Sequence, residues 1–324
     1  MKTTLTLPEL YRPVEDALDL VRAQMMQIWQ DAIALVRAPT GAAPRMGGKM
    51  LRPALCLLSA GAIGARDVNR FASLAAAFEA LHIASLAHDD VIDRALLRRG
   101  DRSLNGLWDN HAAVLGGDYL VARSVEIMAT YDSCPVIANA IQSVRRMAEG
   151  ELYFFGKQDS FTKEDCIHLA EQKTASLFAE ACSAATYIVD GTYRQVLHRF
   201  GTALGIAFQI VDDLLDVTQT TDQLGKPACG DLVEGKRTIP IMYMREALDA
   251  DGIRRLDAMR DADITDADRD WAIAMAEETG ARERTEAEAR AYADAALHEL
   301  GQLPASPYRD SMEGIVEFVL VRGS

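Results

Sequence analysis

Two short acidic segments carry the residues whose types and spacing could do chemistry. Both read Asp-Asp-x-x-Asp, at residues 89–93 and again at residues 212–216. Residues four apart lie on one face of a helix, so the outer aspartates of each segment point the same way. Stacked carboxylates repel each other, and a hard divalent cation such as Mg²⁺ relieves this while also taking phosphate oxygens as ligands. The candidate residues are Asp89, Asp90, Asp93, Asp212, Asp213 and Asp216.

Each acidic segment closes an apolar stretch of helical periodicity, HIASLAHDDVID at residues 82–93 and GIAFQIVDDLLD at residues 205–216. One such segment alone is typical of a solvated helix end. Two of them, each ending a helix that must be buried, favour two helices that deliver acids to one metal site. A pair of carboxylates acting as general acid and base is the less favoured alternative, because that chemistry needs two different environments.

Cations recur in short segments around the acidic ones. A site with six aspartates and Mg²⁺ would hold a polyanion, most simply a diphosphate, and it would need such cations nearby. Each of them alone is typical of a surface charge, but a lysine inside the apolar run at residues 173–185 is costly. His82, on an apolar face, is either a core residue or a phosphate donor. The candidate cations are Lys49, Arg52, Arg98, Arg99, Lys173, Lys226 and Lys236.

The elements that position these residues are predicted to be helices. Between Ala54 and Lys226 the only proline is Pro135, and residues 241–303 contain none. Proline breaks helix interiors, so these stretches permit long helices, and Ala, Leu, Met, Glu and Arg favour them. No linker divides the chain. We therefore expect an all-α protein of ten or more helices, with residues 1–324 forming a single domain.

Composition excludes several classes of protein. Hydrophobic residues make up 49% and charged residues 25%, which excludes general disorder, and the net charge of −14 argues against bulk binding of nucleic acid. The five cysteines are scattered without a CxxC pair, as in a reduced cytoplasmic protein. The start of the sequence does not resemble a signal peptide, and we expect no membrane span because no uncharged apolar run reaches about 18 residues.

The ordered set of motifs resembles the trans-isoprenyl diphosphate synthases, also called the polyprenyl synthetase family. The resemblance runs from about Leu10 to Arg322 and is specific, because seven motifs agree in order and spacing. The motifs are Gly-Gly-Lys-x-x-Arg-Pro, His-x₅-His-Asp-Asp-x-x-Asp, Arg-Arg-Gly, Gly-Asp-Tyr-Leu, Lys-Thr, Phe-Gln-x-x-Asp-Asp-x-x-Asp and Gly-Lys-Pro…Asp-Leu-x-Glu-Gly-Lys.

The resemblance implies an isoprenoid synthase-like fold around a central cavity, usually in a homodimer, that elongates an allylic diphosphate with isopentenyl diphosphate. It further implies roles for single residues. Several Mg²⁺ ions would be held by Asp89, Asp93 and Asp212, with Asp90 and Asp216 in support. The allylic diphosphate would be bound by Arg98, Lys173 and Lys226, with Lys236 nearby. Isopentenyl diphosphate would be bound by Lys49, Arg52, His82 and Arg99. Thr174 and Gln209 would face the developing allylic cation.

Product length is predicted from the residues one turn before Asp89. A bulky aromatic there closes the path of the growing chain in short-chain members of the family, whereas this chain has Ala84 and Ser85. We expect a product of C20 or longer and favour a long-chain polyprenyl diphosphate. The alternative is that these small residues only allow helices to pack.

Three residues depart from the family pattern, and two other functions compete. Phe154 stands where the family usually has Gln, Arg102 where it often has Pro, and Cys229 where Gly is common.

A class I terpene cyclase also uses Mg²⁺, but its second metal motif typically carries Asn, Ser or Thr, and Glu. A subunit of a heteromeric synthase would usually have lost aspartates that are all present here.

Overall fold

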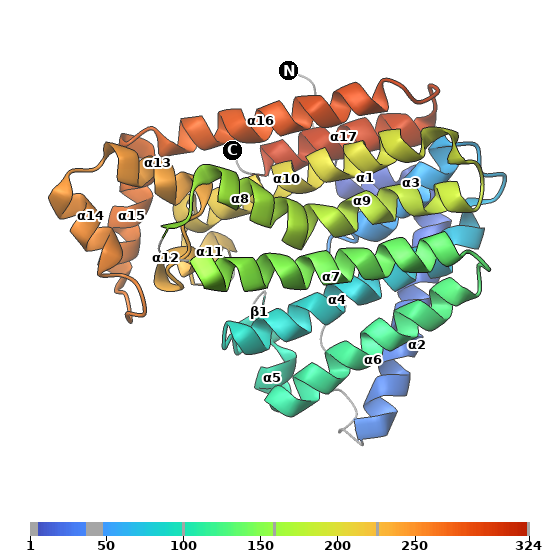
Figure 1. Ribbon diagram of the computed structural model, residues 1–324, viewed down its shortest axis with the longest axis horizontal. Coiled ribbons are helices and arrows are strands. Elements are labelled where there is room, and N and C mark those ends of the chain that lie inside the picture. The colour runs from blue at the N-terminus through green and yellow to red at the C-terminus, as the bar shows by residue number, and fades with distance from the viewer. Residues whose placement is uncertain (1–5, 37–47, 99–100, 158–159, 225–226, 323–324) are drawn as a thin grey trace.

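The computed structural model describes residues 6–36, 48–98, 101–157, 160–224 and 227–322, and its elements are almost all helices (Figure 1). The prediction of an all-α protein is confirmed. Within the described ranges, the exception is a hairpin that follows the first acidic segment, in which β1 (Leu97–Arg98) pairs antiparallel with β2 (Asp101–Arg102).

The helices follow one another with short connections. Single turns η1 (Arg12–Val14), η2 (Val68–Phe71), η4 (Glu171–Ala175), η5 (Ala184–Tyr187) and η6 (Gly191–Tyr193) join or extend them. The α-helices are α1 (Leu7–Tyr11), α2 (Glu15–Val36), α3 (Leu51–Ala62), α4 (Ala72–Ile92), α5 (Leu104–Leu107), α6 (Asn110–Ala129), α7 (Cys134–Lys157), α8 (Lys163–Ala170), α9 (Ser176–Ser183), α10 (Arg194–Thr218), α11 (Thr221–Leu224), α12 (Gly230–Val233), α13 (Ile239–Ala247), α14 (Ala250–Asp257), α15 (Asp266–Glu278), α16 (Ala281–Leu300) and α17 (Pro307–Val321).

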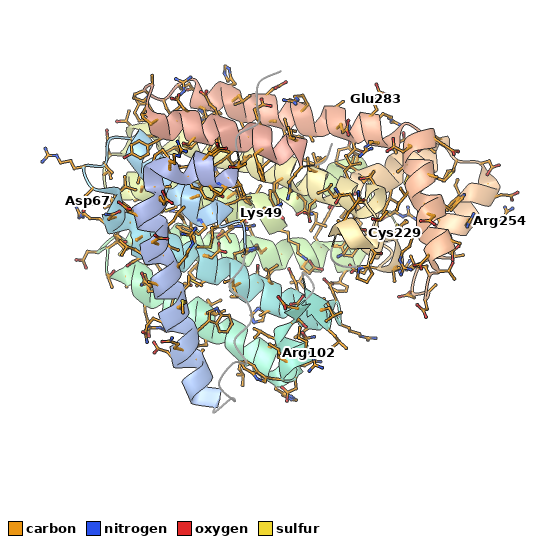
Figure 2. The ribbon with its side chains drawn as sticks, turned by 180° about the vertical axis from the view of Figure 1, so that it is seen from behind. Lys49, Asp67, Arg102, Cys229, Arg254 and Glu283 are labelled. Atoms are coloured by element: carbon orange, nitrogen blue, oxygen red, sulfur yellow. The ribbon has the colours of Figure 1, made fainter. Side chains whose placement is uncertain are left out.

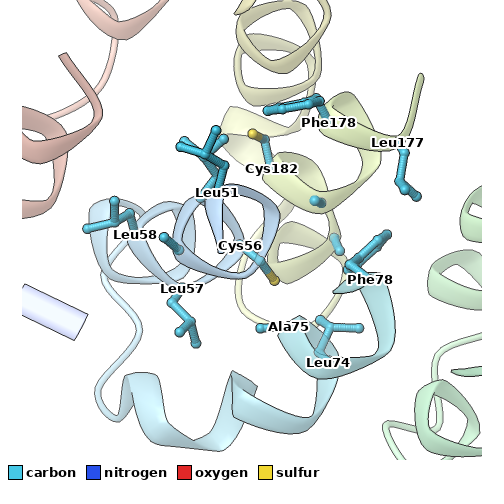
Figure 3. Packing of buried hydrophobic residues seen from close by; sticks show 14 of the residues in the cluster. Leu51, Cys56, Leu57, Leu58, Leu74, Ala75, Phe78, Leu177, Phe178 and Cys182 are labelled. Carbon is cyan, nitrogen blue, oxygen red and sulfur yellow. The ribbon is translucent and has the colours of Figure 1, made fainter. Parts of the chain in front are cut away.

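The core consists of two clusters of buried apolar side chains. The larger one surrounds α3, α4 and α9, where Leu57 of α3, Phe78 of α4 and Phe178 of α9 are enclosed (Figure 3). The second lies between α10, α13, α15 and α16. Helix α10 joins the two, because Leu204 belongs to the first cluster and Ile210 to the second.

One helical stretch, Val68–Ile92, is long and apolar enough to cross a membrane by length and composition alone, which the sequence analysis did not anticipate. Of the tested part of this stretch, 67% is buried inside the protein. Its helix α4 packs against α2, α3 and α6. Its apolar character is therefore explained by its central position in the core.

Helix α10 approaches α9 and the turn η4 very closely, and two glycines make this possible. A Cβ at Gly201 would lie 2.6 Å from the Cα of Ala179, and a Cβ at Gly205 would lie 2.5 Å from the Cα of Ala175. Real Cβ atoms do not come so near backbone atoms, so the helices could not pack this way with larger residues. This close packing fixes η4 against the half of α10 that leads to the second acidic segment.

We expect Gly205→Ala to lower the free energy of unfolding by about 1–3 kcal/mol, because the added methyl group has backbone atoms in its way. The matched control is Gly116→Ala in α6, where the nearest atom to an added Cβ is a leucine methyl group 3.9 Å away. This variant should be neutral or stabilised by up to about 1 kcal/mol, because alanine favours helix. Urea unfolding followed by circular dichroism measures both, and equal effects would contradict the packing argument.

Candidate active site

Both acidic segments lie at the C-terminal ends of long helices, α4 and α10, which point to the same end of the bundle (Figure 1). Asp89 and Asp90 lie in the last turn of α4, and Asp93 is the residue that ends the helix. In α10 the corresponding aspartates occupy the last two turns. Asp90 and Asp216 are almost fully buried, whereas Asp212 is about half exposed.

Lys173 and Thr174 lie in η4, which is a single turn of π-helix between α8 and α9. The Nζ atom of Lys173 is 2.6 Å from Oε2 of Glu151 on α7 and 3.3 Å from Oδ1 of Asp89. Burial alone would lower the pKa of Lys173, but the carboxylates of Asp89 and Glu151 outweigh it and raise that pKa. The lysine inside the apolar run is thus paired, and it connects α7 to the first acidic segment.

The aspartates are held where ionisation is unfavourable. Burial raises the pKa of Asp89 and of Asp93, although Lys173 opposes the shift at Asp89 and Lys236 opposes it at Asp93. At Asp213, burial raises the pKa to about 7, against a hydrogen bond from Gln209. Nearby cations would favour the ionised form of all three carboxylates.

The donors in this site suit a hard divalent cation, because they are carboxylate oxygens with a deficit of positive charge around them. Among the residues that the structure describes, no three His, Cys, Asp or Glu side chains converge as a complete protein cage for a metal ion. Mg²⁺ commonly takes only one or two protein carboxylates and completes its shell with water and phosphate oxygens. The acidic helix ends therefore fit Mg²⁺ that is bound together with a phosphate group.

A hydrogen-bonded chain joins the π turn to the second acidic segment. The hydroxyl group of Thr174 donates to Oε1 of Gln209 at 2.6 Å, and Nε2 of Gln209 donates to Oδ1 of Asp213 at 2.7 Å. Gln209 and Asp213 are one helical turn apart on α10, so the same face presents both. The amide group is thereby fixed in orientation, with Thr174 and Asp213 on its two sides.

Asp216 holds the segment that follows α10. The backbone N–H of Asp231 donates to Oδ2 of Asp216 at 2.9 Å, and the N–H of Cys229 donates to the carbonyl oxygen of Asp216 at 2.8 Å. Cys229, the residue found where the family favours glycine, has a φ of 61°. This left-handed conformation costs a residue with a Cβ more than it costs glycine. Figure 2 shows Cys229 between the centre of the molecule and Arg254 of α14.

Lys236 brings positive charge to both acidic segments. Burial alone would lower its pKa, but the carboxylates of Asp231, Glu234 and Asp93 raise it. It forms an ion pair with Glu234, and its charge acts on the pKa of Asp93 and of Asp213. The second lysine of the site thus lies between the ends of α4 and α10.

A cavity of about 120 Å³ opens between these groups. Its lining combines polar groups, among them Lys173, Lys236 and Asp213, with apolar side chains. Phe154 is one of these apolar side chains, and its ring meets that of Phe161 edge to face at a centroid distance of 5.3 Å. An aromatic pair therefore stands where the family's usual glutamine would present a polar group.

Of the residues expected to bind isopentenyl diphosphate, the three that the structure describes, Lys49, Arg52 and His82, lie outside the lining of this cavity. Arg52, in the first turn of α3, is buried and stacks on the ring of Phe178, 4.4 Å from its centre. Lys49 is exposed near the middle of the molecule, with its Nζ atom 5.8 Å from the ring centre of Phe318 (Figure 2). His82 is half-buried on α4, two turns before Asp89.

The two residues expected to set product length lie on α4, one turn before Asp89. Ala84 is buried in the larger core cluster. Ser85 is half-buried, and its hydroxyl group donates to the carbonyl oxygen of His82 at 2.8 Å. Of the remaining expected residues, Arg99 and Lys226 lie outside the described residues, and only the backbone of Arg98 is described, in β1.

The fold brings three further residues to the site that were not predicted from the sequence: Glu151, Asp231 and Arg322. Glu151 reaches Lys173 because its neighbour Gly150 lets α7 approach η4, where an added Cβ would lie 2.9 Å from Gln172. Gly150 was the feature of the sequence that could have indicated this close approach of α7 to η4. Asp231 lies inside a quoted motif, whereas nothing in the pattern around Arg322 indicated a role.

Comparisons with known proteins show which family this chain belongs to. A family model described as polyprenyl synthetase matches residues 34–275. An all-trans-nonaprenyl-diphosphate synthase (geranyl-diphosphate specific) from Rhodobacter capsulatus is 35% identical over 296 residues, which cover 90% of each chain. Heptaprenyl diphosphate synthase component 2 from Bacillus subtilis (strain 168) is 30% identical over 95% of this chain and 89% of its own.

Solved structures of polyprenyl synthases also match this chain. A polyprenyl synthase from Caulobacter crescentus CB15, complexed with calcium and isoprenyl diphosphate, superimposes with a TM-score of 0.91 at 31% sequence identity, and the match covers 100% of both chains. The family model alone spans most of the chain, and the relatives extend the match to nearly all of it. The chain therefore belongs to the polyprenyl synthetase family.

Proposed function

We propose that this protein elongates an allylic diphosphate with isopentenyl diphosphate to give an all-trans polyprenyl diphosphate. The observation that carries the proposal is the convergence of buried carboxylates from α4 and α10 with Lys173 and Lys236. Such a site favours a polyanion accompanied by divalent cations, which is how a diphosphate is held. The relatives that match almost the whole chain are named as prenyl diphosphate synthases.

Mg²⁺ would be held by Asp89, Asp93 and Asp212, with Asp90, Asp213 and Asp216 in support. When bound, the ions would stabilise negative charge on the departing diphosphate. The Caulobacter relative is complexed with calcium and isoprenyl diphosphate, which supports the pairing of a divalent cation with a diphosphate substrate.

The chain's own residues divide the remaining tasks. Lys173 and Lys236, together with Arg98 and Lys226, would bind the allylic diphosphate and stabilise its charge as the C–O bond breaks. Thr174 and Gln209 would direct oxygen atoms at the resulting allylic cation. The alkene of the second substrate then attacks this cation. That second substrate would be bound by Lys49, Arg52, His82 and Arg99. The proton lost afterwards goes to the diphosphate, so no strong protein base is required.

Purified protein supplied with Mg²⁺, farnesyl diphosphate and labelled isopentenyl diphosphate should make labelled prenyl diphosphates, and EDTA should stop the reaction. We expect Asp89→Ala and Asp212→Ala to lower incorporation at least about 100-fold, because each removes a ligand of the charge-stabilising ions. Asp294→Ala, at an exposed position of α16, is the control and should keep full activity. Normal turnover by either site variant would overturn the metal assignment.

Two alternatives are distinguished by the same assay. A class I terpene cyclase would release a cyclic hydrocarbon and leave isopentenyl diphosphate unused. A subunit of a heteromeric synthase would incorporate no label until its partner was added, and the Bacillus relative is named as one component of such a pair. The complete set of six aspartates favours a catalytic chain over a subunit that has lost activity.

We propose that the product has at least 20 carbon atoms and belongs to the long-chain class, as the nonaprenyl name of the Rhodobacter relative suggests. The growing chain would run along α4, past the small side chains of Ala84 and Ser85. Ala84 and Ser85 keep a fixed position relative to Asp89 because one helix carries all three.

Ala84→Phe should shorten the product, because an aromatic ring one turn from Asp89 would block the path, and chromatography against standards of known length measures this. Ala84 is fully buried, so overpacking is expected to cost about 1–3 kcal/mol of stability. Ser85→Phe, at a half-buried position, is the second variant, and Ser85→Ala should leave product length unchanged. Unchanged products from both phenylalanine variants would contradict the path along α4.

We also propose a homodimer formed through α7 and the adjacent α6. Along α7, Ile141, Ala148, Leu152 and Phe155 lie on one exposed stripe that also carries Arg145, and Leu152 is 71% and Phe155 57% exposed. Leu115 of α6 is 67% exposed. Apolar side chains gathered on one face are typical of a protein–protein interface.

The double variant Leu152→Asp/Phe155→Asp should be monomeric in analytical ultracentrifugation, because buried unpaired carboxylates oppose association. Leu20→Asp is the matched control, since Leu20 is 49% exposed but lies on α2. It should sediment as the wild type does. A wild-type protein that sediments as a monomer would contradict the homodimer.

The chain is proposed to form one domain and to act in the cytoplasm. Helix α10 contributes to both core clusters, which supports a single folding unit. All five cysteines are free thiols, as expected where disulfides do not persist.

A further inference from the structure

A tyrosine of the first helix is hydrogen-bonded to the turn that precedes α3. The hydroxyl group of Tyr11, the last residue of α1, donates to the carbonyl oxygen of Lys49 at 2.6 Å, across a separation of 38 residues. Tyr11 is buried, and burial together with the carboxylate of Glu79 raises the pKa of Tyr11, so its hydroxyl group keeps the proton that it donates. The first helix thus fixes the backbone at a residue that the proposed function assigns to isopentenyl diphosphate.

Met50, which follows Lys49, has a backbone conformation that its side chain disfavours. Its φ is 51° and its ψ is 33°, in the left-handed region, where a Cβ atom crowds the backbone. A residue keeps such a conformation only where its surroundings impose it. The carbonyl group of Lys49 belongs to the peptide unit that turns when the φ of Met50 changes. The hydrogen bond from Tyr11 therefore opposes relaxation of this torsion.

The strained torsion lies between two cations of the proposed site. Arg52 follows it in the first turn of α3, a helix whose residues are all buried, whereas Lys49 precedes it and is exposed. Relaxation of Met50 would therefore move Lys49 and leave Arg52 in place. Two cations bind one diphosphate best when their relative position is fixed beforehand, because less conformational freedom is then lost on binding.

Tyr11 is itself held in place by contacts outside the site. In the first turn of α1, the carboxylate of Glu9 accepts a hydrogen bond from the N–H of Thr6 at 2.8 Å. On α17, Gly314 leaves room for Leu10, since an added Cβ would lie 2.3 Å from the Cδ2 atom of that leucine. Helix α1 is thereby seated on α17, and it presents the hydroxyl group of Tyr11 at a fixed position.

We propose that Tyr11 is a positioning residue for the second substrate. Its hydrogen bond keeps Met50 in the left-handed conformation, and this conformation holds Lys49 where it and Arg52 together bind isopentenyl diphosphate. The inference rests on the proposed function, which assigns both cations to that substrate. Tyr11 need not contact the substrate itself. Loss of its hydroxyl group should weaken the binding of isopentenyl diphosphate and spare that of the allylic diphosphate, which is assigned to other residues.

Tyr11→Phe removes the hydroxyl group and retains the ring, so it tests the hydrogen bond without emptying the core. We expect the KM for isopentenyl diphosphate to rise about fivefold to tenfold, as for the loss of one hydrogen bond, while kcat and the KM for farnesyl diphosphate change less than about twofold. The matched control is Tyr131→Phe, which removes a hydroxyl group that donates to the carbonyl oxygen of Arg70 at 2.7 Å. This control should leave both KM values unchanged.

A second substitution tests whether the conformation of Met50 is the link. Glycine adopts the left-handed conformation without steric cost, whereas alanine shortens the side chain and keeps that cost. In the Tyr11→Phe background, Met50→Gly should return the KM for isopentenyl diphosphate to within about twofold of the wild-type value, and Met50→Ala should not. Equal KM values for the two double variants would contradict the proposal.

The outcomes distinguish this inference from the proposed function. A wild-type protein that incorporates no label overturns both. An active wild type whose Tyr11→Phe variant keeps its KM for isopentenyl diphosphate overturns the positioning role alone. If Tyr11→Phe does not fold, as judged by circular dichroism, Met50→Val takes its place, because a β-branched residue tolerates the left-handed region least. Met50→Val should then raise the same KM and Met50→Asn should not, and equal values for these two would overturn the positioning role.

Discussion

Carboxylates placed where water solvates them poorly are the constraint on which the rest of the structure depends. Burial raises the pKa of Asp89, Asp93 and Asp213, and Lys173 and Lys236 offset this only in part. Such an arrangement destabilises the empty protein and stabilises whatever brings positive charge. A diphosphate with its metal ions would do this, because the ions would neutralise the acids while the lysines would neutralise the phosphates. Much of the affinity of the site for a metal-bound diphosphate would therefore come from the positive charge that its buried carboxylates lack in the empty protein.

The fold can be understood as the means of keeping these charges in place. Helices α4 and α10 carry the acids at one end and the core along their length, so the acidic segments cannot separate without disturbing buried side chains. Gly205 lets the π turn lie against α10, and from there Thr174 reaches Gln209. The same contact directs Lys173 towards α4, so one close approach of two helices orients both residues of the turn.

Local patterns in the sequence predicted the helices and the acidic ends, because absent prolines and residues spaced by four are properties of a single element. They could not predict partners on other elements. Glu151 pairs with Lys173 although 22 residues separate them, and Asp216 holds the segment that follows α10 through the backbone N–H of Asp231. The burial of the apolar stretch that ends in Asp89 was predicted, but its neighbours α2, α3 and α6 could be named only from the fold. Phe154 was noticed as a departure, but its pairing with Phe161 required the fold.

The π turn has a consequence for how this chain can vary in length. Such a turn holds one residue more than the α-helical turn that it replaces, so a deletion within Glu171–Ala175 would restore a regular helix from α8 into α9. Every residue on one side of the deletion would then rotate by about 100° relative to the other side. Lys173 and Thr174 could then no longer both face the ends of α4 and α10. The extra residue of the π turn therefore sets the directions in which Lys173 and Thr174 point, and its deletion would turn them away from the two acidic segments.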